Sequence, residues 1–277
     1  MKTVTTLNEL RAARAELPGT LGFVPTMGYL HAGHISLVQL AKRDCTSVIV
    51  SIFVNPAQFG PNEDLDAYPR DIPRDLHMLE EAGVDLVWLP TPEVIYPPGF
   101  QTWVDLEEIT QPLEGGMRPG HFRGVATVVA KLFNAVEPDK AYFGQKDAQQ
   151  VAVIKRMALD LNFALEVVVG PTQREEDGLA LSSRNKYLND AERAAAPVLQ
   201  RALHAAQAAY AAGERNATTL RALMQRTIEA EPLARLQYVS CAHPLTLQEL
   251  DTVSEGALLS MAVYFGKTRL IDNLVLE

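Results

Sequence analysis

The sequence of 277 residues contains only two cysteines, Cys45 and Cys241, which lie far apart in the chain. Two thiols cannot build a disulfide framework or a zinc site of the usual spacing, so we expect free thiols in a reducing, cytoplasmic environment. The sequence also lacks an uncharged run of membrane-spanning length. Residues 2–16 have charges spread throughout and no apolar core of the kind that a signal peptide needs. We therefore expect a soluble protein.

Positive charge is scarce as well. The chain has 25 Lys and Arg residues against 34 Asp and Glu residues, which gives a formal net charge of −9. This balance disfavours broad binding to nucleic acid or to a membrane surface, so small molecules are the expected partners. A Walker A motif and a Gly-x-Gly-x-x-Gly motif are both missing, which argues against a P-loop ATPase or a dehydrogenase.

What the sequence does contain is a regular alternation of strands and helices up to Pro171. This alternation predicts a Rossmann-like α/β domain with a right-handed, mostly parallel sheet over residues 1–172. Helices followed by strands then predict a smaller α+β domain over residues 173–277. We expect strands at 21–24, 47–54, 84–89, 141–143, 165–169, 236–241, 257–265 and 270–276, and helices at 8–16, 75–82, 125–136, 148–161, 190–212 and 218–230, with a helical pattern from Ile35 onward.

The run from Pro25 to His34 reads as the end of a strand, a glycine-containing turn and the start of a helix. Free backbone N–H groups at a helix N-terminus attract anions, most often phosphate. His31 and His34 are three residues apart, so their rings should lie on the same side of the first turn. This arrangement predicts a phosphate cradle. A metal site and a purely structural role stay open as alternatives.

Other polar side chains follow predicted strands, at the sheet edge where α/β proteins bind ligands. Lys146 is suited to phosphate oxygens and Gln58 and Gln150 to a small polar substrate, although each could instead be a surface residue. Ser182-Ser183-Arg184 offers hydroxyls and a guanidinium group for phosphates, or simply caps the helix that follows. The loop at 111–124 is rich in glycine and carries Arg118, His121 and Arg123, which is typical of a functional loop or of a solvated turn.

Several of these blocks together resemble the pantothenate synthetase, or pantoate–β-alanine ligase, family. The resemblance covers nearly the whole chain, whereas the His-x-Gly-His element alone would indicate only the wider superfamily of nucleotidylyltransferases. The blocks are Pro25-Thr-Met-Gly-Tyr-Leu-His-Ala-Gly-His34, Val50-Ser-Ile-Phe-Val-Asn-Pro-Ala-Gln-Phe59, Arg118-Pro-Gly-His-Phe-Arg-Gly124, Phe143-Gly-Gln-Lys-Asp-Ala-Gln-Gln150, Asp177-Gly-Leu-Ala-Leu-Ser-Ser-Arg-Asn185 and Arg269-Leu-Ile-Asp-Asn273.

The resemblance implies a Rossmann-like domain with a smaller lid domain, and a ligase that acts in two steps. ATP and (R)-pantoate would form pantoyl adenylate and pyrophosphate, and β-alanine would then displace AMP to give pantothenate. A magnesium ion and a homodimer are also implied, and His34, His31 and Lys146 would be catalytic. The residues implied to bind ATP are Met27, Gly28, Tyr29, Leu30, His31, Ala32, Gly33, His34, Gly144, Gln145, Lys146, Asp147, Gln173, Leu181, Ser182, Ser183 and Arg184.

The remaining implied roles concern the other substrates and the metal. Gln58 would hold pantoate and position β-alanine, and Gln150 would hold pantoate from the other side. Arg118 would be a phosphate or lid contact. Asp75 would be a carboxylate on the magnesium side, although Arg74 stands where some relatives have a second acid.

This sequence departs from the family's pattern at two of the ATP-binding positions. Gln145 replaces a glutamate, with little effect expected, and Gln173 replaces an apolar residue whose backbone contacts adenine. A main-chain contact would survive the second change. Two other readings stay open at this point, namely a nucleotidylyltransferase that keeps the nucleotide on its product and a nucleotide-binding regulatory module without turnover.

Overall fold

The chain forms two compact units. The computed structural model describes residues 1–61, 63 and 65–277. The first unit contains Met1–Gly144 and Val153–Pro171, and the second contains Gln145–Ala152 and Thr172–Glu277. The boundary expected at residue 172 stays a prediction, and the segment Gln145–Ala152 lies with the second unit although the chain around it belongs to the first.

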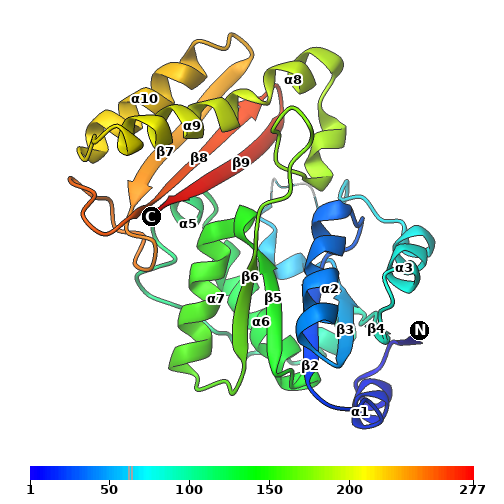
Figure 1. The fold of residues 1–277 in the computed structure, drawn as a ribbon. Coiled ribbons are helices and arrows are strands. Elements are labelled where there is room, and N and C mark those ends of the chain that lie inside the picture. The colour runs from blue at the N-terminus through cyan, green and yellow to red at the C-terminus, as the bar shows by residue number, and fades with distance from the viewer. Residues whose placement is uncertain (62, 64) are drawn as a thin grey trace. The chain divides into compact units, whose positions relative to one another are not determined.

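A six-stranded sheet forms the centre of the first unit (Figure 1). Every strand pairs with its neighbours in parallel, in the order β1-β4-β3-β2-β5-β6. The predicted parallel α/β sheet is therefore confirmed, with β1 as a short strand that the sequence pattern did not indicate. The bounds are β1 Lys2–Val4, β2 Leu21–Thr26, β3 Ser47–Ile52, β4 Leu86–Trp88, β5 Lys140–Gly144 and β6 Glu166–Gly170.

Helix α2 packs its apolar stripe against the sheet. In α2, Leu37, Val38 and Ala41 are buried in a core that also contains residues of β2 and β3. Burying each Leu or Val side chain contributes about 1.5–3 kcal/mol. All six residues of β3 are buried, as expected for a strand covered on both faces. The helices are α1 Leu7–Ala15, α2 Ala32–Asp44, η1 Pro56–Gln58, α3 Ile72–Glu81, α4 Pro92–Ile95, α5 Glu114–Met117 and α6 His121–Val136, and α7 Ala148–Asp160 begins in the second unit and ends in the first.

Strand β2 continues through Pro25 to Thr26, two residues further than the sequence predicted. Proline cannot donate a backbone hydrogen bond, so it is normally excluded from a strand with neighbours on both sides. Here β5 pairs only with Gly22 and Phe23 of β2. At Pro25 the strand therefore has a neighbour on one side only, which is β3.

Part of the predicted loop at 111–124 is helical. Helix α5 occupies Glu114–Met117, and α6 begins at His121, four residues before the expected start. Phe122 and Val125 are both buried, so the apolar face of α6 includes its first turn. This burial outweighs the low helix propensity of the surrounding glycines, which had favoured a loop.

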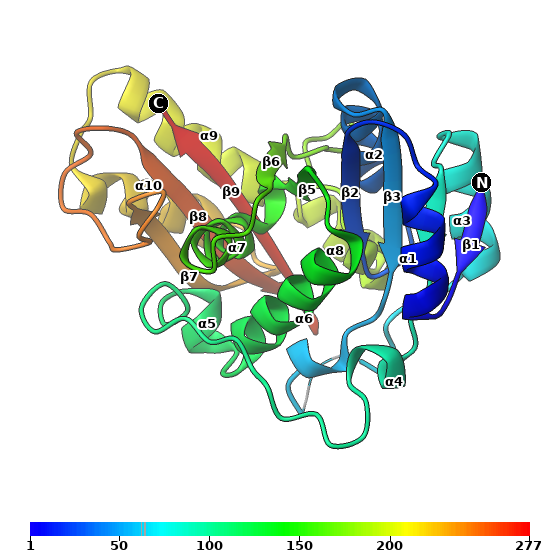
Figure 2. The same cartoon turned by 90° about the horizontal axis from the view of Figure 1, so that it is seen from below.

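The second unit has a three-stranded antiparallel sheet in the order β7-β8-β9, covered on one face by two helices (Figures 1 and 2). Its bounds are η2 Gln145–Asp147, η3 Ser183–Tyr187, α8 Asp190–Ala195, α9 Val198–Ala211, α10 Ala217–Glu229, β7 Ala234–Ala242, β8 Ala257–Phe265 and β9 Thr268–Leu276. A core of its own lies between α9, α10 and the sheet. The predicted α+β pattern is therefore present.

A single helix was expected at 190–212, but the structure has two. Proline lacks the backbone N–H of the helical ladder and its ring clashes with the preceding turn. Accordingly α8 ends at Ala195 and α9 begins at Val198, with Pro197 between them. In the part of the chain that the structure describes, no helix combines the length and the apolar character needed to cross a membrane.

Candidate active site

The turn between β2 and α2 is held by a carboxylate from a neighbouring helix. Gly28 has φ +82° and Tyr29 has φ +49°, so two successive residues lie in the left-handed region. A Cβ atom at Gly28 would lie 2.9 Å from Ile52 and 3.1 Å from Asp75, which makes glycine necessary there. Asp75 of α3 accepts the backbone N–H groups of Tyr29 at 2.7 Å and of Leu30 at 2.8 Å. The turn therefore has a defined shape before α2 begins.

The two histidines lie at the N-terminus of α2, as predicted. Nδ1 of His31 accepts the N–H of Gly33 at 3.1 Å, and Nδ1 of His34 accepts the N–H of His31 at 3.2 Å. The ring centroids are 4.0 Å apart, so the rings do lie on the same side of the first turn. Because each Nδ1 is an acceptor, the proton of each neutral ring is on Nε2, which makes Nε2 a hydrogen-bond donor.

Asp75 is fully buried and engaged with the protein. Burial raises the pKa of this carboxyl, although the N–H groups of Leu30 and Tyr29 and the charge of Arg74 act in the opposite direction. The guanidinium group of Arg74 lies 3.6 Å from the carboxylate and 5.3 Å from the ring centroid of Tyr29. Both carboxylate oxygens therefore hold the turn, and the magnesium-side role predicted for Asp75 stays a prediction.

Gln58 ends the short helix η1 and lies beside the turn. Its side-chain oxygen accepts a hydrogen bond from Asn55 at 3.1 Å, and its amide nitrogen lies 3.0 Å from the sulfur atom of Met27. Asn55 is itself buried and donates to the backbone oxygen of Gly124 in α6 at 3.2 Å. The structure thus brings together Gln58 and Met27, which the resemblance assigned to pantoate and to ATP.

Arg118 lies in a network that holds the backbone of Gln58. Its guanidinium group donates to both carboxylate oxygens of Glu63 at 2.6 Å and to Nε2 of His121 at 3.1 Å. His121 Nδ1 in turn donates to the backbone oxygen of Gln58 at 2.8 Å. Arg118 also reaches that oxygen at 3.4 Å. The phosphate contact predicted for Arg118 stays a prediction, and in this structure its partners are protein groups.

Burial and the charge of Arg118 shift the pKa values of His121 and Glu63. Burial and the neighbouring charge of Arg118 lower the pKa of His121 to about 4. Burial alone would raise the pKa of Glu63, but the hydrogen bonds and charge of Arg118 outweigh it and hold that pKa below its usual range. At neutral pH the network is therefore an Arg–Glu ion pair beside a neutral imidazole.

The second unit carries the other predicted ATP-binding segments. Lys146 lies in η2, and its ammonium group is 3.3 Å from the carboxylate of Asp147. Ser182 is the N-cap of η3, where its hydroxyl oxygen accepts the N–H of Arg184 at 3.3 Å. The cluster therefore caps the short helix η3, whereas the helix that begins at Asp190 is capped by Asn189. The backbone oxygen of Gln173 accepts the N–H of Leu181 at 2.9 Å.

The family model for pantoate–β-alanine ligase matches residues 1–275. A pantothenate synthetase from Herpetosiphon aurantiacus is 62% identical over 277 residues, which is 100% of both chains. One from Chloroflexus aurantiacus is 63% identical over 278 residues, covering 100% of this chain and 99% of the relative. This chain belongs to the pantoate–β-alanine ligase family.

Solved structures of this ligase family have the same fold. A pantothenate synthetase from Thermus thermophilus is 51% identical with a TM-score of 0.95, and 99% of each chain is covered. A pantoate–β-alanine ligase from Francisella tularensis is 37% identical with a TM-score of 0.81, covering 99% of this chain and 97% of that one. The second was solved in complex with β,γ-ATP and β-alanine. The chain is therefore a ligase with the family's α/β fold.

Sequence reasoning missed the residues that support the ligase motifs. Asn55, Glu63 and Tyr96 had no assigned role, yet Tyr96 donates its hydroxyl proton to Asn55 at 2.8 Å and Asn55 supports Gln58. Asn55 lies within a block of the resemblance, which was the one available signal. Among the described residues, no group of three or more His, Cys, Asp or Glu side chains is arranged to hold a metal ion.

Proposed function

We propose that this protein uses ATP to activate (R)-pantoate as pantoyl adenylate and then transfers the pantoyl group to β-alanine. Membership of the pantoate–β-alanine ligase family over residues 1–275 carries this proposal. The Francisella tularensis relative, which was solved in complex with β,γ-ATP and β-alanine, supports the choice of two of the three substrates. The products are pantothenate, AMP and pyrophosphate.

The first step needs hydrogen-bond donors beside the phosphates. A pantoate carboxylate oxygen attacks the α-phosphorus of ATP, the bond from that phosphorus to the bridging oxygen breaks, and pyrophosphate leaves with the electron pair. Negative charge therefore builds on the phosphate oxygens. The arrangement of His31 and His34 supports a role here, because their Nδ1 atoms accept backbone hydrogen bonds and their Nε2–H groups are donors. One well-placed donor of this kind contributes about 2.7–4 kcal/mol to catalysis.

Cationic and hydroxyl groups would add to this stabilisation. We assign Lys146 to the phosphates as a point charge, and Ser182, Ser183 and Arg184 to the triphosphate. Gly144, Gln145, Asp147, Gln173 and Leu181 complete the ATP-binding set that we propose, together with Met27–His34.

Gln58 and Gln150 are assigned to pantoate, and Gln58 also to β-alanine. The side chain of Gln58 is oriented by Asn55, and its backbone is held by His121 and Arg118. This rigid support is what a substrate-positioning amide requires, because orientation of reactants contributes about 7–11 kcal/mol in favourable cases. In the second step the amine nitrogen of β-alanine attacks the pantoyl carbonyl carbon, loses a proton, and AMP leaves.

Magnesium is proposed to arrive with the nucleotide. The described residues do not offer a cluster of three His, Cys, Asp or Glu side chains, and both oxygens of Asp75 accept backbone hydrogen bonds. Phosphate oxygens are common ligands of this ion, which seldom has an all-protein cage. When bound, it would neutralise phosphate charge.

The assembly and location of the protein are also proposals. The family resemblance supports a homodimer, which sedimentation analysis would test. Cys45 and Cys241 are both free and buried, which fits a reducing cytoplasm.

The adenylate mechanism is tested by isotope exchange. With pantoate and magnesium present and β-alanine absent, the protein should exchange labelled pyrophosphate into ATP. A preparation that makes pantothenate but shows no exchange would contradict the adenylate route. Product analysis separates the ligase from a nucleotidylyltransferase, because the ligase releases free AMP whereas a nucleotidylyltransferase leaves a stable nucleotidyl product. Magnesium-dependent ATP consumption excludes a regulatory module without turnover.

A further inference from the structure

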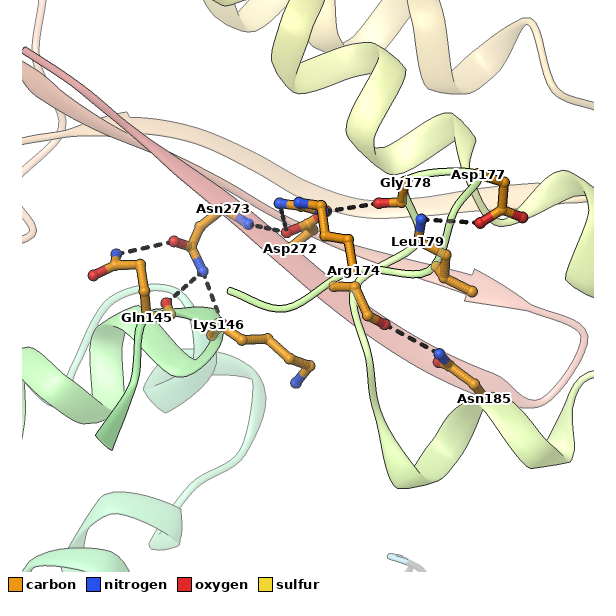
Figure 3. Close-up of polar contacts among 10 residues, drawn as sticks. Gln145, Lys146, Arg174, Asp177, Gly178, Leu179, Asn185, Asp272 and Asn273 are labelled. Carbon is orange, nitrogen blue, oxygen red and sulfur yellow. Dashed lines mark hydrogen bonds and ion pairs between the residues drawn. The ribbon is translucent and has the colours of Figure 1, made fainter. Parts of the chain in front are cut away.

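Strand β9 contains the block Arg269-Leu-Ile-Asp-Asn273, which the proposed function leaves without a role. Asp272 and Asn273 are buried there, with 2% and 5% of their surface exposed. Buried polar side chains are retained at low cost only when they are hydrogen-bonded. Figure 3 shows that these two side chains contact two different segments, both of which belong to the second unit.

Asn273 holds the turn that carries Lys146 through three hydrogen bonds, which we call the clamp. Its Nδ2 atom donates to the backbone oxygens of Gln145 at 3.0 Å and of Lys146 at 2.8 Å. Its Oδ1 atom accepts from Nε2 of Gln145 at 3.1 Å. Because backbone oxygens only accept hydrogen bonds, both N–H groups of the amide are committed to this turn and its orientation is fixed. The clamp joins residues that are 127 and 128 positions apart in the sequence.

Asp272 ties a second segment to the same strand. Its carboxylate accepts two hydrogen bonds from Arg174, at 2.6 and 2.9 Å, and the N–H of Asn273 at 2.8 Å. Arg174 also donates to the backbone oxygen of Gly178 at 3.0 Å. This ion pair fixes the loop that leads into residues 181–184, and β9 is in contact with both η2 and η3. Both proposed ATP-binding segments of the second unit are therefore anchored on one strand.

We propose that Asn273 is a positioning residue, which fixes the η2 backbone so that Lys146 is held ready for the phosphates of ATP. This inference rests on the proposed function of Lys146. It also gives Gln145 a reason to be glutamine in this chain, because its amide N–H donates to Oδ1 of Asn273, and an ionised glutamate could not. The presence of glutamine there was expected to matter little, whereas the structure places this side chain in the clamp.

The test begins with Asn273→Asp, which removes both donors and places a carboxylate against two backbone oxygens. In pyrophosphate exchange we expect the KM for ATP to rise at least tenfold, while the KM for pantoate stays within twofold of the wild-type value. Hydrogen exchange should become faster at the amides of residues 145–148. The matched control is Asn216→Asp, an exposed N-cap of α10 where aspartate caps equally well. It should leave all of these values unchanged.

A double-mutant cycle separates positioning from a general loss of structure. If Asn273 acts through Lys146, Asn273→Asp should change the KM for ATP less than threefold in a Lys146→Ala background. Equal effects in both backgrounds would overturn the proposal, as would an unchanged KM for ATP in the single variant. If Asn273→Asp does not fold, Asn273→Ala removes the clamp without adding charge and should give the same pattern.

The test of the proposed function is separate from the test of the role of Asn273. A wild-type protein without pyrophosphate exchange would contradict the adenylate mechanism, whereas hydrogen exchange at residues 145–148 would still test the clamp. In that case, equal exchange rates at these amides in the wild type and in Asn273→Asp would overturn the clamp as well.

Discussion

His31 and His34 each have two functions at the scale of the residue. Their Nδ1 atoms complete a capping box at the start of α2, and their Nε2–H groups are the proposed phosphate donors. Capping boxes usually pair a small N-cap residue with Glu or Gln three residues later. Imidazole can replace both because Nδ1 lies close to the backbone, as a side-chain oxygen would. In each ring, the capping of α2 therefore depends on Nδ1, and the proposed contact with phosphate depends on Nε2–H.

This division predicts the effect of His34→Gln. The glutamine oxygen can still accept the N–H of His31, so the capping box and the stability should be retained. With that oxygen engaged in the cap, the amide N–H groups of glutamine no longer lie where the Nε2–H group of His34 does, so the rate of pantoate-dependent pyrophosphate exchange should fall by about 10²–10³-fold. His34→Ala should lose the same activity and in addition about 0.5–2 kcal/mol of stability, as typical caps do. A His34→Gln protein with full exchange activity would exclude the catalytic role.

The low pKa of His121 predicts a pH-dependent stability. The folded protein holds this pKa at about 4, below the ordinary value of 6.5. As pH falls from 6.5 towards 4 the unfolded chain therefore binds a proton that the folded protein does not, so stability is lost over this window. His121→Gln keeps a donor for Gln58 and an acceptor for Arg118 without the titration. In urea unfolding at about pH 7 and about pH 5, the variant should lose less stability than the wild type. Equal losses would contradict the assigned cause.

At the scale of the element, the approach of α6 to η1 places Gln58. The two are in contact, and a Cβ atom on Gly124 would lie 2.2 Å from the backbone oxygen of Ala57. Real Cβ atoms do not approach this closely, so any larger residue must push η1 away. Gly124 was part of the resemblance, but its close contact with the backbone of Ala57 in η1 is visible only in the structure.

Gly124→Ala should therefore move Gln58. We expect a loss of about 1–3 kcal/mol of stability, as is usual for overpacking, and an increase in the KM for pantoate that exceeds any change in the KM for ATP. Asn134→Ala is the control, because Asn134 lies on the same helix and its side chain bonds only within that helix in the contacts described. Enzyme kinetics and thermal unfolding measure both effects. An unchanged KM for pantoate would show that Gln58 does not depend on this contact.

Element types were largely predictable and their ends were not. The buried β-branched run of β3 and the apolar stripe of α2 follow from spacing of near neighbours, and both were confirmed. The break at Pro197 and the early start of α6 were missed. The break depends on the ring geometry of one proline, and the early start of α6 depends on burial against distant segments. Hydrophobic periodicity reports neither effect.

At the scale of the whole molecule, the proposed ATP-binding residues come from both units. Each unit also has one buried thiol, Cys45 in the first and Cys241 in the second. Burial raises the pKa of Cys241 to about 11, so its thiol reacts only when the second unit opens. The two thiols therefore report separately on the two units.

ATP with magnesium should slow the labelling of both thiols. A ligand at about one hundred times its dissociation constant stabilises the binding-competent state by about 2.7 kcal/mol, so labelling through full opening should slow about a hundredfold. Dithionitrobenzoate labelling followed by peptide mass spectrometry gives the rate at each cysteine, with magnesium alone as the control. Unchanged labelling of Cys45 would contradict the ATP-binding role of the residues in the first unit, and unchanged labelling of Cys241 that of the residues in the second.

The sequence was enough to identify the family, the α/β character and the motif residues, because these depend on short blocks and on local periodicity. The groups that hold those motifs in place could be identified only in the folded protein. Asp75 binds the turn 46 residues before it, Arg118 binds Glu63, and Asn273 binds the turn at Lys146. Such partners are brought together by the packing of whole elements, and the sequence alone does not specify the distance between two side chains that are far apart along the chain.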